Sequence, residues 1–290
     1  MSVDVGSRAA ETADSRPLAL DSAPPAVTSP PPVARRSRTP SRVGAWIAPL
    51  ALGVVVLGIW EALVHGAGLP ELILPAPGAV LVAFWRGMLD GLLPSNALAT
   101  LVESLTGFAL GAVVAVPLGY AVARSRWLAW AFQPYLAASQ AMPAVALAPL
   151  LVLWLGFGLP PTATLCALIV FFPATITTTL GIRALDRDVL DAARVDGANA
   201  WALARYVELP LALPAILAGL RASITLSITG AVVGEFVAGD QGLGSLLNIA
   251  RNQFDSALVF ATLLALGLLA AALYGLARLV ERRLSYLEDQ

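Results

Sequence analysis

The sequence predicts an all-α membrane protein with six transmembrane helices, and three observations favour this class. Of the 290 residues, 58% are hydrophobic and only 13% are charged, and the mean hydropathy of +0.78 is far above that of a soluble domain. Long runs without any charged residue recur, and they are continuous rather than alternating as in the strands of a membrane barrel. The basic residues gather in alternate connections between these runs.

The first 42 residues differ from the rest of the chain. They contain seven prolines and six arginines, and they have too few apolar residues to form a core. Residues 1–42 are therefore expected to form a disordered, solvated tail. Residues 43–285 are expected to form the transmembrane domain.

Six helices are expected in this domain, because a bilayer is crossed by roughly 20 apolar residues in a helix. The longest uncharged run, residues 127–182, is too long for one span, and the segment 154–161, with two glycines and two prolines, divides it. A further short helix, from about Gly78 to Leu89, is expected to lie at the membrane surface. The six expected spans are residues 43–60, 104–123, 134–155, 160–182, 211–234 and 256–277.

The arginines predict the orientation, because basic connections stay in the cytoplasm. Arg124 and Arg126 follow the second span, and four arginines lie between the fourth and fifth spans. If the tail and the arginine-rich C-terminus lie on the same side, only Arg86 and Arg251 are left outside. Both termini and the connection 183–210 are therefore expected to be cytoplasmic.

Residues 183–210 carry the local signals of a helix, a tight turn and a second helix. Asp186 or Asp188 is expected to cap the first helix, and Asn199 the second. Gly197 stands between them, where a left-handed residue ends a helix, and a side chain there is also expected to fill the turn. The adjacent alanines 192 and 193 form a flat patch that another protein can approach closely.

The spacing within this segment resembles that of a known family. Asp-Ala-Ala at 191–193 is followed after three residues by Gly197, and after nine more by Val-Glu-Leu-Pro at 207–210. The signature loop of permease subunits of binding-protein-dependent ATP-binding-cassette (ABC) importers is similar: Glu-Ala-Ala, three residues, Gly, nine residues, Ile-x-Leu-Pro. Asp191 and Val207 are conservative departures from it. The residues that match directly are Ala192, Ala193, Gly197, Leu209 and Pro210.

Other stretches extend the resemblance over about residues 45–285. The segments "ILPAPGAV", "GFALGAVVAVPLG", "QAMPAVALAPLLVLWLGFG" and "GEFVAGDQGLGSLL" resemble the nitrate, sulfonate and taurine branch of the family. The stretch "GAVVGEFVAGD" is also similar to permeases for pyrimidine precursors or riboflavin. The resemblance therefore implies a small solute of one of these two groups.

The resemblance also implies a type I importer fold and several partners. The loop 183–210, with Asp191 as its first signature residue, becomes a coupling helix that docks onto a separate ATPase subunit. That subunit binds the ATP, so no cofactor is expected in this chain. A substrate-binding protein outside the cell delivers the solute, and a second, identical permease chain completes the path. The location implied is the lipid of a bacterial inner membrane.

Polar residues within the expected spans are candidates for the translocation path or a gate. Glu235 either forms part of an external gate, accepts a hydrogen bond from a neighbouring helix, or is solvated at the interface. Arg221 either attracts an anionic solute, or packs at a helix end and extends toward water. Thr225 and Thr229, one helical turn apart, either line the path or join two helices. Gln140 is the remaining candidate.

The residue inventory excludes other functions. The chain has no lysine, which excludes a Walker A phosphate loop and thus ATP hydrolysis by that mechanism. One Cys and one His in different segments supply neither a metal site nor a catalytic residue with its base, and no nucleic-acid partner is expected. The alternative is a self-sufficient secondary transporter, but no internal repeat or central acidic ion ligand supports it.

Overall fold

A computed structural model describes residues 42–66, 70–139 and 144–286. Within these ranges every regular element is a helix, which confirms the all-α prediction for the described residues. The chain divides into a first unit, Met1–Leu50, and a second unit, Ala51–Gln290, which contains nearly all of the described helices. The predicted tail lies outside the described residues except for Arg42, and the candidate Gln140 lies outside them as well.

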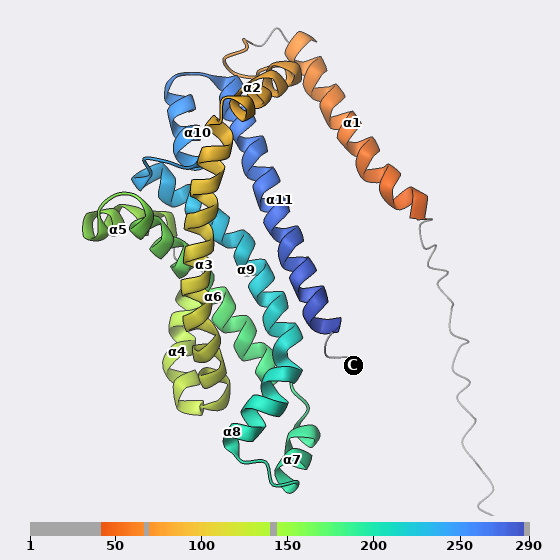
Figure 1. Cartoon of the computed structure of the whole chain (residues 1–290), viewed down its shortest axis with the longest axis vertical. Coiled ribbons are helices and arrows are strands. Elements are labelled where there is room, and N and C mark those ends of the chain that lie inside the picture. The colour runs from red at the N-terminus through yellow and green to blue at the C-terminus, as the bar shows by residue number, and fades with distance from the viewer. Residues whose placement is uncertain (1–41, 67–69, 140–143, 287–290) are drawn as a thin grey trace, which may run out of the picture. The chain divides into compact units, whose positions relative to one another are not determined.

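The elements follow one another with short connections (Figure 1). Most are α-helices; η1 is a 3₁₀ turn and η2 a π-helical turn. In chain order they are α1 (Arg42–Gly66), α2 (Pro77–Leu89), α3 (Leu92–Arg124), α4 (Arg126–Ser139), η1 (Ala144–Leu147), α5 (Ala148–Leu155), α6 (Leu159–Arg183), α7 (Arg187–Val195), α8 (Ala200–Leu203), η2 (Ala204–Glu208), α9 (Leu209–Ala238), α10 (Leu243–Asn252) and α11 (Ser256–Tyr286).

Four of the described helices are long and apolar enough to cross a membrane. They are α3, α6, the continuous helix Ala200–Ala238 that includes α9, and α11. These four correspond to the predicted spans 104–123, 160–182, 211–234 and 256–277. In the region of the first predicted span, Ala51–Gly66 is a shorter apolar helix.

The predicted span 134–155 is not one long helix in the described residues. Pro134 lies inside α4, which ends at Ser139, and the described chain resumes as η1 and then α5. Pro149 lies in the first turn of α5, where its missing N–H cannot continue a preceding helix. Gly156 ends α5 with a φ of +80°, which a glycine adopts without strain. Proline and glycine thus divide an apolar run that composition alone presents as continuous.

Small residues allow α6 to pack closely against both α3 and α9 (Figure 1). Gly107 and Gly111 lie one turn apart on the face of α3 that meets α6, and a Cβ atom on Gly111 would lie 2.7 Å from the carbonyl oxygen of Ala167. On α9, a Cβ atom on Gly234 would lie 2.8 Å from the methyl group of Thr162. Such close contacts between backbones are typical of helices that associate in lipid.

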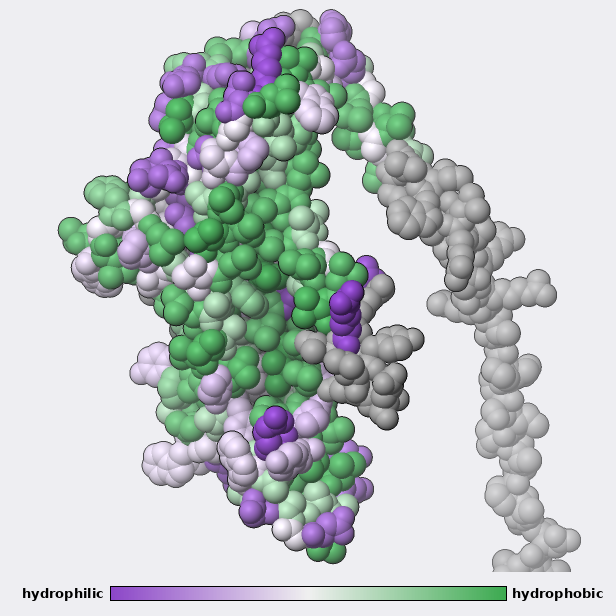
Figure 2. All heavy atoms as spheres, viewed as in Figure 1, coloured by the Kyte–Doolittle hydropathy of each residue, from purple (hydrophilic) through white to green (hydrophobic). Residues whose placement is uncertain are grey.

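The outer surface of the long helices is apolar. On the face shown in Figure 2, hydrophobic residues cover their middle and hydrophilic residues gather toward their ends. Large side chains on these helices, such as Val113 of α3 and Leu180 of α6, are 73% and 60% exposed. An apolar surface this extensive fits contact with lipid hydrocarbon rather than water.

Short helices lie at the two ends of the long ones (Figure 1). α7 and α8 connect α6 with α9 at one end, and α2 and α10 lie at the other. α2 confirms the short helix predicted at 78–89. Nearby, Trp60 donates from Nε1 to the carbonyl oxygen of Pro75 at 3.1 Å, and its ring centre lies 5.4 Å from that of Phe260 on α11. The polar residues of interest occur in two regions, one at each end.

Candidate functional site

The segment between α6 and α9 forms the predicted helix–turn–helix. Asp186 caps α7, because its Oδ1 accepts a hydrogen bond from the N–H of Asp188 at 2.9 Å. Asn199 caps α8, because its Oδ1 accepts from the N–H of Ala202 at 2.8 Å. These caps pair backbone donors that a helix start leaves free, so they define where each short helix begins.

Gly197 ends α7 in the left-handed conformation that its position predicts, with a φ of +91°. The N–H of Ala198 is bonded to the carbonyl oxygen of Ala193 at 3.0 Å, and the N–H of Gly197 to that of Arg194 at 3.1 Å. This pair of bonds is the Schellman motif. The expectation that a side chain would fill the turn is wrong, since a Cβ atom here would meet no atom within 4 Å. Glycine is required by the backbone angle and not by lack of space.

The loop presents a surface that the described chain leaves uncovered. Asp191, Ala192 and Gly197 are exposed, and Ala193 is half-buried. Asp191 also forms an ion pair with Arg194 on the same helix. Val195 and Trp201 are 87% and 73% exposed, although both are apolar. The predicted patch of small residues therefore lies beside apolar side chains that are free to contact another surface.

A buried glutamate fastens this loop to a membrane helix. Glu208, in η2, is 1% exposed. The hydroxyl of Tyr120 donates to its Oε2 at 2.6 Å, and Nη1 of Arg124 lies 3.2 Å from its Oε1. Both partners lie in the last two turns of α3. Because a buried carboxylate is costly unless it is paired, this contact links the position of the loop to that of α3.

Leu209 and Pro210, the last signature residues, begin α9. Leu209 packs against Ile182 near the end of α6 and Ile216 of α9. Pro210 lies just after the π-helical turn η2 inside the continuous helix Ala200–Ala238, where its ring removes one backbone N–H donor. The signature therefore combines an exposed part, residues 191–197, with a part packed between the membrane helices.

At the other end of the bundle, side chains from neighbouring helices accept hydrogen bonds from three successive backbone N–H groups at the start of α10. The bonds run from Gly242 to Asn96 Oδ1 at 2.9 Å, from Leu243 to Thr100 Oγ1 at 2.8 Å, and from Gly244 to the carboxylate of Glu235. Donors at a helix start have no partner within the helix, and a carboxylate there is favoured by the helix dipole. We call these six residues the α10 clasp.

Glu235 is therefore a buried residue. It is 1% exposed, so the alternative of a solvated interfacial carboxylate is wrong, whereas the hydrogen bond from a neighbouring helix is present. A Cβ atom on Gly242 would lie 2.2 Å from the carboxyl carbon of Glu235. The carboxyl group of Glu235 thus occupies the space that a side chain at Gly242 would need.

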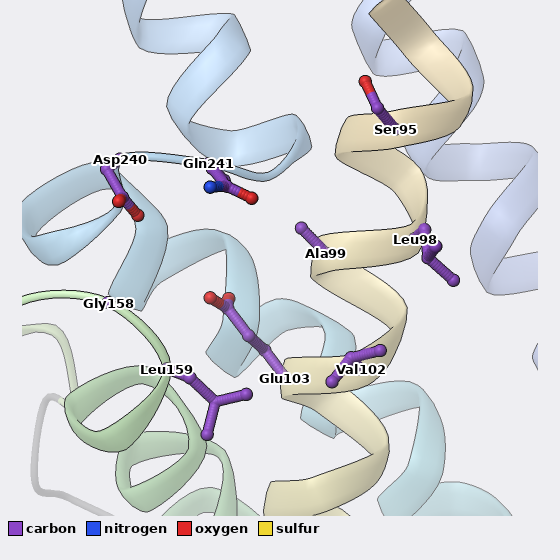
Figure 3. A pocket seen from close by; sticks show the side chains of 9 residues that line it. All are labelled: Ser95, Leu98, Ala99, Val102, Glu103, Gly158, Leu159, Asp240 and Gln241. Atoms are coloured by element: carbon purple, nitrogen blue, oxygen red, sulfur yellow. The ribbon is translucent and has the colours of Figure 1, made fainter. Parts of the chain in front are cut away.

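Beside the clasp lies a pocket of about 450 Å³ (Figure 3). Glu103 of α3 points into it, and Asp240 and Gln241, after α9, lie over it (Figure 3). Glu103 is 6% exposed, and its Oε2 is buried without a hydrogen-bond partner among the described residues. Its carboxyl group neighbours that of Glu235. The other lining residues are Ser95, Leu98, Ala99, Val102, Gly158 and Leu159.

Arg221, Thr225 and Thr229, the remaining candidates within the described residues, do not line this pocket. Nη1 of Arg221 lies 2.5 Å from Oε2 of Glu281 on α11, so its charge is compensated within the chain. On α9, Thr229 is exposed and Thr225 is half-buried. A second pair of hydroxyl side chains one turn apart on the same helix, Ser223 and Ser227, is fully buried.

Two glutamates outside the predicted site are buried: Glu208, to which the sequence assigned no role, and Glu103, which its place near the end of a predicted span had suggested to be interfacial. Glu208 occupies the unspecified position of the signature, and Glu103 lies inside an otherwise apolar helix. The available signal was the same for both: a carboxylate next to or within a run long enough to cross a membrane. Their partners could not be read from the sequence, because Tyr120 and Glu208 are 88 residues apart.

The long apolar helices and the lipid-compatible surface define a multi-pass membrane protein. Residues 107–286 match the family described as "Binding-protein-dependent transport system inner membrane component". The chain belongs to this family and is a permease subunit of an ABC importer. Membership implies an ATPase subunit and a substrate-binding protein as partners, and it decides against the secondary transporter.

Several relatives are similar over most of their length. The chain is 49% identical over 231 residues to the riboflavin transport system permease protein of Chloroflexus aurantiacus, covering 80% of this chain and 86% of the relative. It is 30% identical over 239 residues to a putative aliphatic sulfonates transport permease protein of Bacillus subtilis, covering 82% and 87%. It is also 30% identical over 223 residues to the formylaminopyrimidine transport permease protein of Halalkalibacterium halodurans, covering 77% and 88%.

The fold is similar to that of a solved importer. Structures of the MetNI methionine ABC transporter in inward-facing conformations align with a TM-score of 0.59 at 17% sequence identity, covering 65% of this chain and 94% of the other. At this identity the similarity concerns the fold alone.

Proposed function

We propose that this permease forms the path for riboflavin or a closely related flavin. The observation that carries the proposal is the difference in similarity among relatives: 49% identity to a riboflavin permease, against 30% to permeases for sulfonates and formylaminopyrimidine. The stretch around Glu235 had pointed to the same group. The sulfonate, taurine and nitrate group becomes the less favoured substrate class.

In this proposal residues 183–210 are the coupling loop that docks onto the ATPase subunit. Three features support the assignment: the signature spacing, the exposed apolar Val195 and Trp201, and the buried link from Glu208 to α3. ATP is bound by the partner, and the absence of lysine from this chain agrees with that division of labour.

We further propose two identical permease chains per importer in a bacterial cell membrane. Each contributes six membrane segments, with both termini and the coupling loop in the cytoplasm. Four segments are the long helices, and the other two involve residues 43–66 and 134–155. Support for a facing second chain comes from α9, where Ala222, Leu226 and Thr229 form one exposed face at helical spacing. Such a face would otherwise lie against lipid.

The substrate is tested with the complete importer in proteoliposomes, supplied with its binding protein. We expect ATP-dependent, saturable accumulation of labelled riboflavin, inhibited by unlabelled riboflavin and not by taurine. A complex lacking the ATPase subunit is the control. Accumulation of taurine in place of riboflavin would return the chain to the sulfonate group.

A further inference from the structure

We propose that the pocket at Glu103 binds the transported flavin through an N–H group of its ring, so that this permease itself contributes to substrate selection. This inference rests on the proposed flavin substrate. The chemical class that the pocket takes is a neutral, largely apolar heterocycle that donates hydrogen bonds.

The first argument is the unpaired acceptor. Glu103 is more than nine-tenths buried, and its Oε2 has no donor among the described residues. Buried polar atoms in native proteins nearly always have a partner. Oε1 of the neighbouring Glu235 likewise has none among the described residues, so this pair of carboxyl groups presents two acceptors to the pocket region, and the proposal assigns a ligand N–H to the one on Glu103. Glu103 points into the pocket, where such a donor would arrive (Figure 3).

The second argument is the charge of the lining. Glu103 and Asp240 are carboxylates, Glu235 lies directly beside Glu103, and no basic side chain occurs among the described lining residues. An anion buried in such a site needs a basic partner, and the described lining provides none. The pocket is therefore unsuited to an anion such as a sulfonate, and suited to a neutral or cationic donor.

The third argument is the distribution of polar and apolar groups. Leu98, Val102 and Leu159 provide apolar walls for the face of a ring. The imide edge of a flavin has one N–H flanked by two carbonyl groups. Glu103 accepts from the N–H, and the amide of Gln241 can donate to a neighbouring carbonyl. A volume of about 450 Å³ also falls within the usual range for small-molecule sites.

A ligand bound in this pocket would also affect a gate formed by the neighbouring α10 clasp. Asp240 and Gln241 line the pocket directly before Gly242 of the α10 clasp, and α10 lies at the end of the bundle opposite α7 and α8 (Figure 1). The carboxyl groups of Glu103 and Glu235 are neighbours, and Glu235 belongs to the α10 clasp. A ligand bound to Glu103 is therefore separated from the clasp by a single side chain.

The experiment compares two substrates in the same importer. Initial uptake of riboflavin and of N3-methylriboflavin, which lacks the imide N–H, is measured for wild type, Glu103→Gln and the control Glu71→Gln, an exposed glutamate outside the pocket. Because all variants use the same binding protein, its own preference cancels when the uptake ratios are compared. We expect wild type and Glu71→Gln to share one ratio of riboflavin to N3-methylriboflavin, and Glu103→Gln to lower that ratio by about tenfold, as expected for the loss of one buried hydrogen bond.

An unchanged ratio in Glu103→Gln, with riboflavin still imported by wild type, would overturn this inference and leave the proposed substrate standing. Failure of wild type to import riboflavin would overturn both. If Glu103→Gln does not assemble, Gln241→Glu on the exposed rim replaces it, with the exposed Gln253→Glu as its control. A carboxylate facing the flavin carbonyls should reduce riboflavin uptake at least several-fold, and equal uptake in the two variants would overturn the inference.

Discussion

At the scale of single residues, three buried glutamates determine how the short helices are held. Glu208 joins the loop 183–210 to α3, Glu235 holds the start of α10, and Glu103 lies beside Glu235 with an oxygen that has no hydrogen-bond partner in the described part of the chain. A carboxylate in an apolar surrounding is costly, and each here either has specific partners or faces a pocket. Their positions, at the two ends of the membrane helices, match the two places where a permease must meet other proteins and its solute.

Gly197 supports a prediction at this scale. Gly197→Val should cost about 1–3 kcal/mol in the turn, because a β-branched residue resists a positive φ. We expect normal insertion, since the apolar spans are unchanged, but reduced co-purification of the ATPase subunit and reduced riboflavin uptake. Gly197→Asn is the matched control, because asparagine tolerates the left-handed region. Wild-type behaviour of Gly197→Val in both assays would mean that residues 183–210 are only a connector.

At the scale of elements, glycines determine which helices become neighbours. α6 is packed between α3 and α9 at distances that leave no room for a Cβ atom at several positions. In lipid no hydrophobic effect drives helices together, so close van der Waals contact between backbones takes its place. The position of α3 also matters for function, because α3 carries Glu103 in its first half and the partners of Glu208 in its last two turns.

A substitution at this contact is expected to destabilise the bundle. In Gly111→Val the Cβ atom would lie 2.7 Å from a backbone oxygen of α6, so the helices must separate, at a cost of about 1–3 kcal/mol or more. Gly275→Val on α11 is the control, because nothing lies within 4 Å of its Cβ position. Thermal unfolding of the purified protein in detergent should show a lower midpoint for the first variant only. Equal midpoints would show that the α3–α6 contact adapts to larger residues.

At the scale of the whole molecule, the described helices place two functional regions at opposite ends of an apolar middle (Figures 1 and 2). α9 connects them directly, since it begins at the coupling loop and ends beside the pocket. Its 30 residues correspond to about 45 Å at 1.5 Å per residue, enough to cross the apolar core of a bilayer. In the proposed importer, this helix therefore carries a displacement at the ATPase to the solute pocket.

The orientation of these two ends can be measured by cysteine labelling. Asn199→Cys should react with a membrane-impermeant maleimide only from the cytoplasmic side, and Gln241→Cys only from outside, because the arginines gather at the end that carries residue 199. The native Cys166 is fully buried and serves as the unreactive background. Labelling of position 199 in intact cells would reverse the proposed topology.

The coupling loop shows how far local sequence determines structure. A cap at Asp186 or Asp188, a cap at Asn199 and the left-handed Gly197 are all predictable, because each depends on residues only two to five positions away; the structure selects Asp186 for the first cap. The long apolar runs likewise determined the helical class and four of the membrane helices, because a helix in lipid must satisfy its own backbone. The division of 134–155 was not predicted, because the prediction relied on the apolar composition of this run and gave no weight to Pro149.

Only the tertiary structure decided which distant side chains meet. Glu208 pairs with Tyr120, and Arg221 pairs with Glu281, which is sixty residues away. Asn96 and Thr100 accept hydrogen bonds from the start of α10, more than 140 residues later in the chain. Glu235 appeared equally suited to solvent or to a neighbouring helix until the packing of α9 against α10 buried it. The sequence by itself determined the class of protein, four of its long helices and the spacing of its signature loop, because these are properties of contiguous segments. The pocket and the clasp depend on helix neighbours, which are chosen by packing between small residues far apart in the chain.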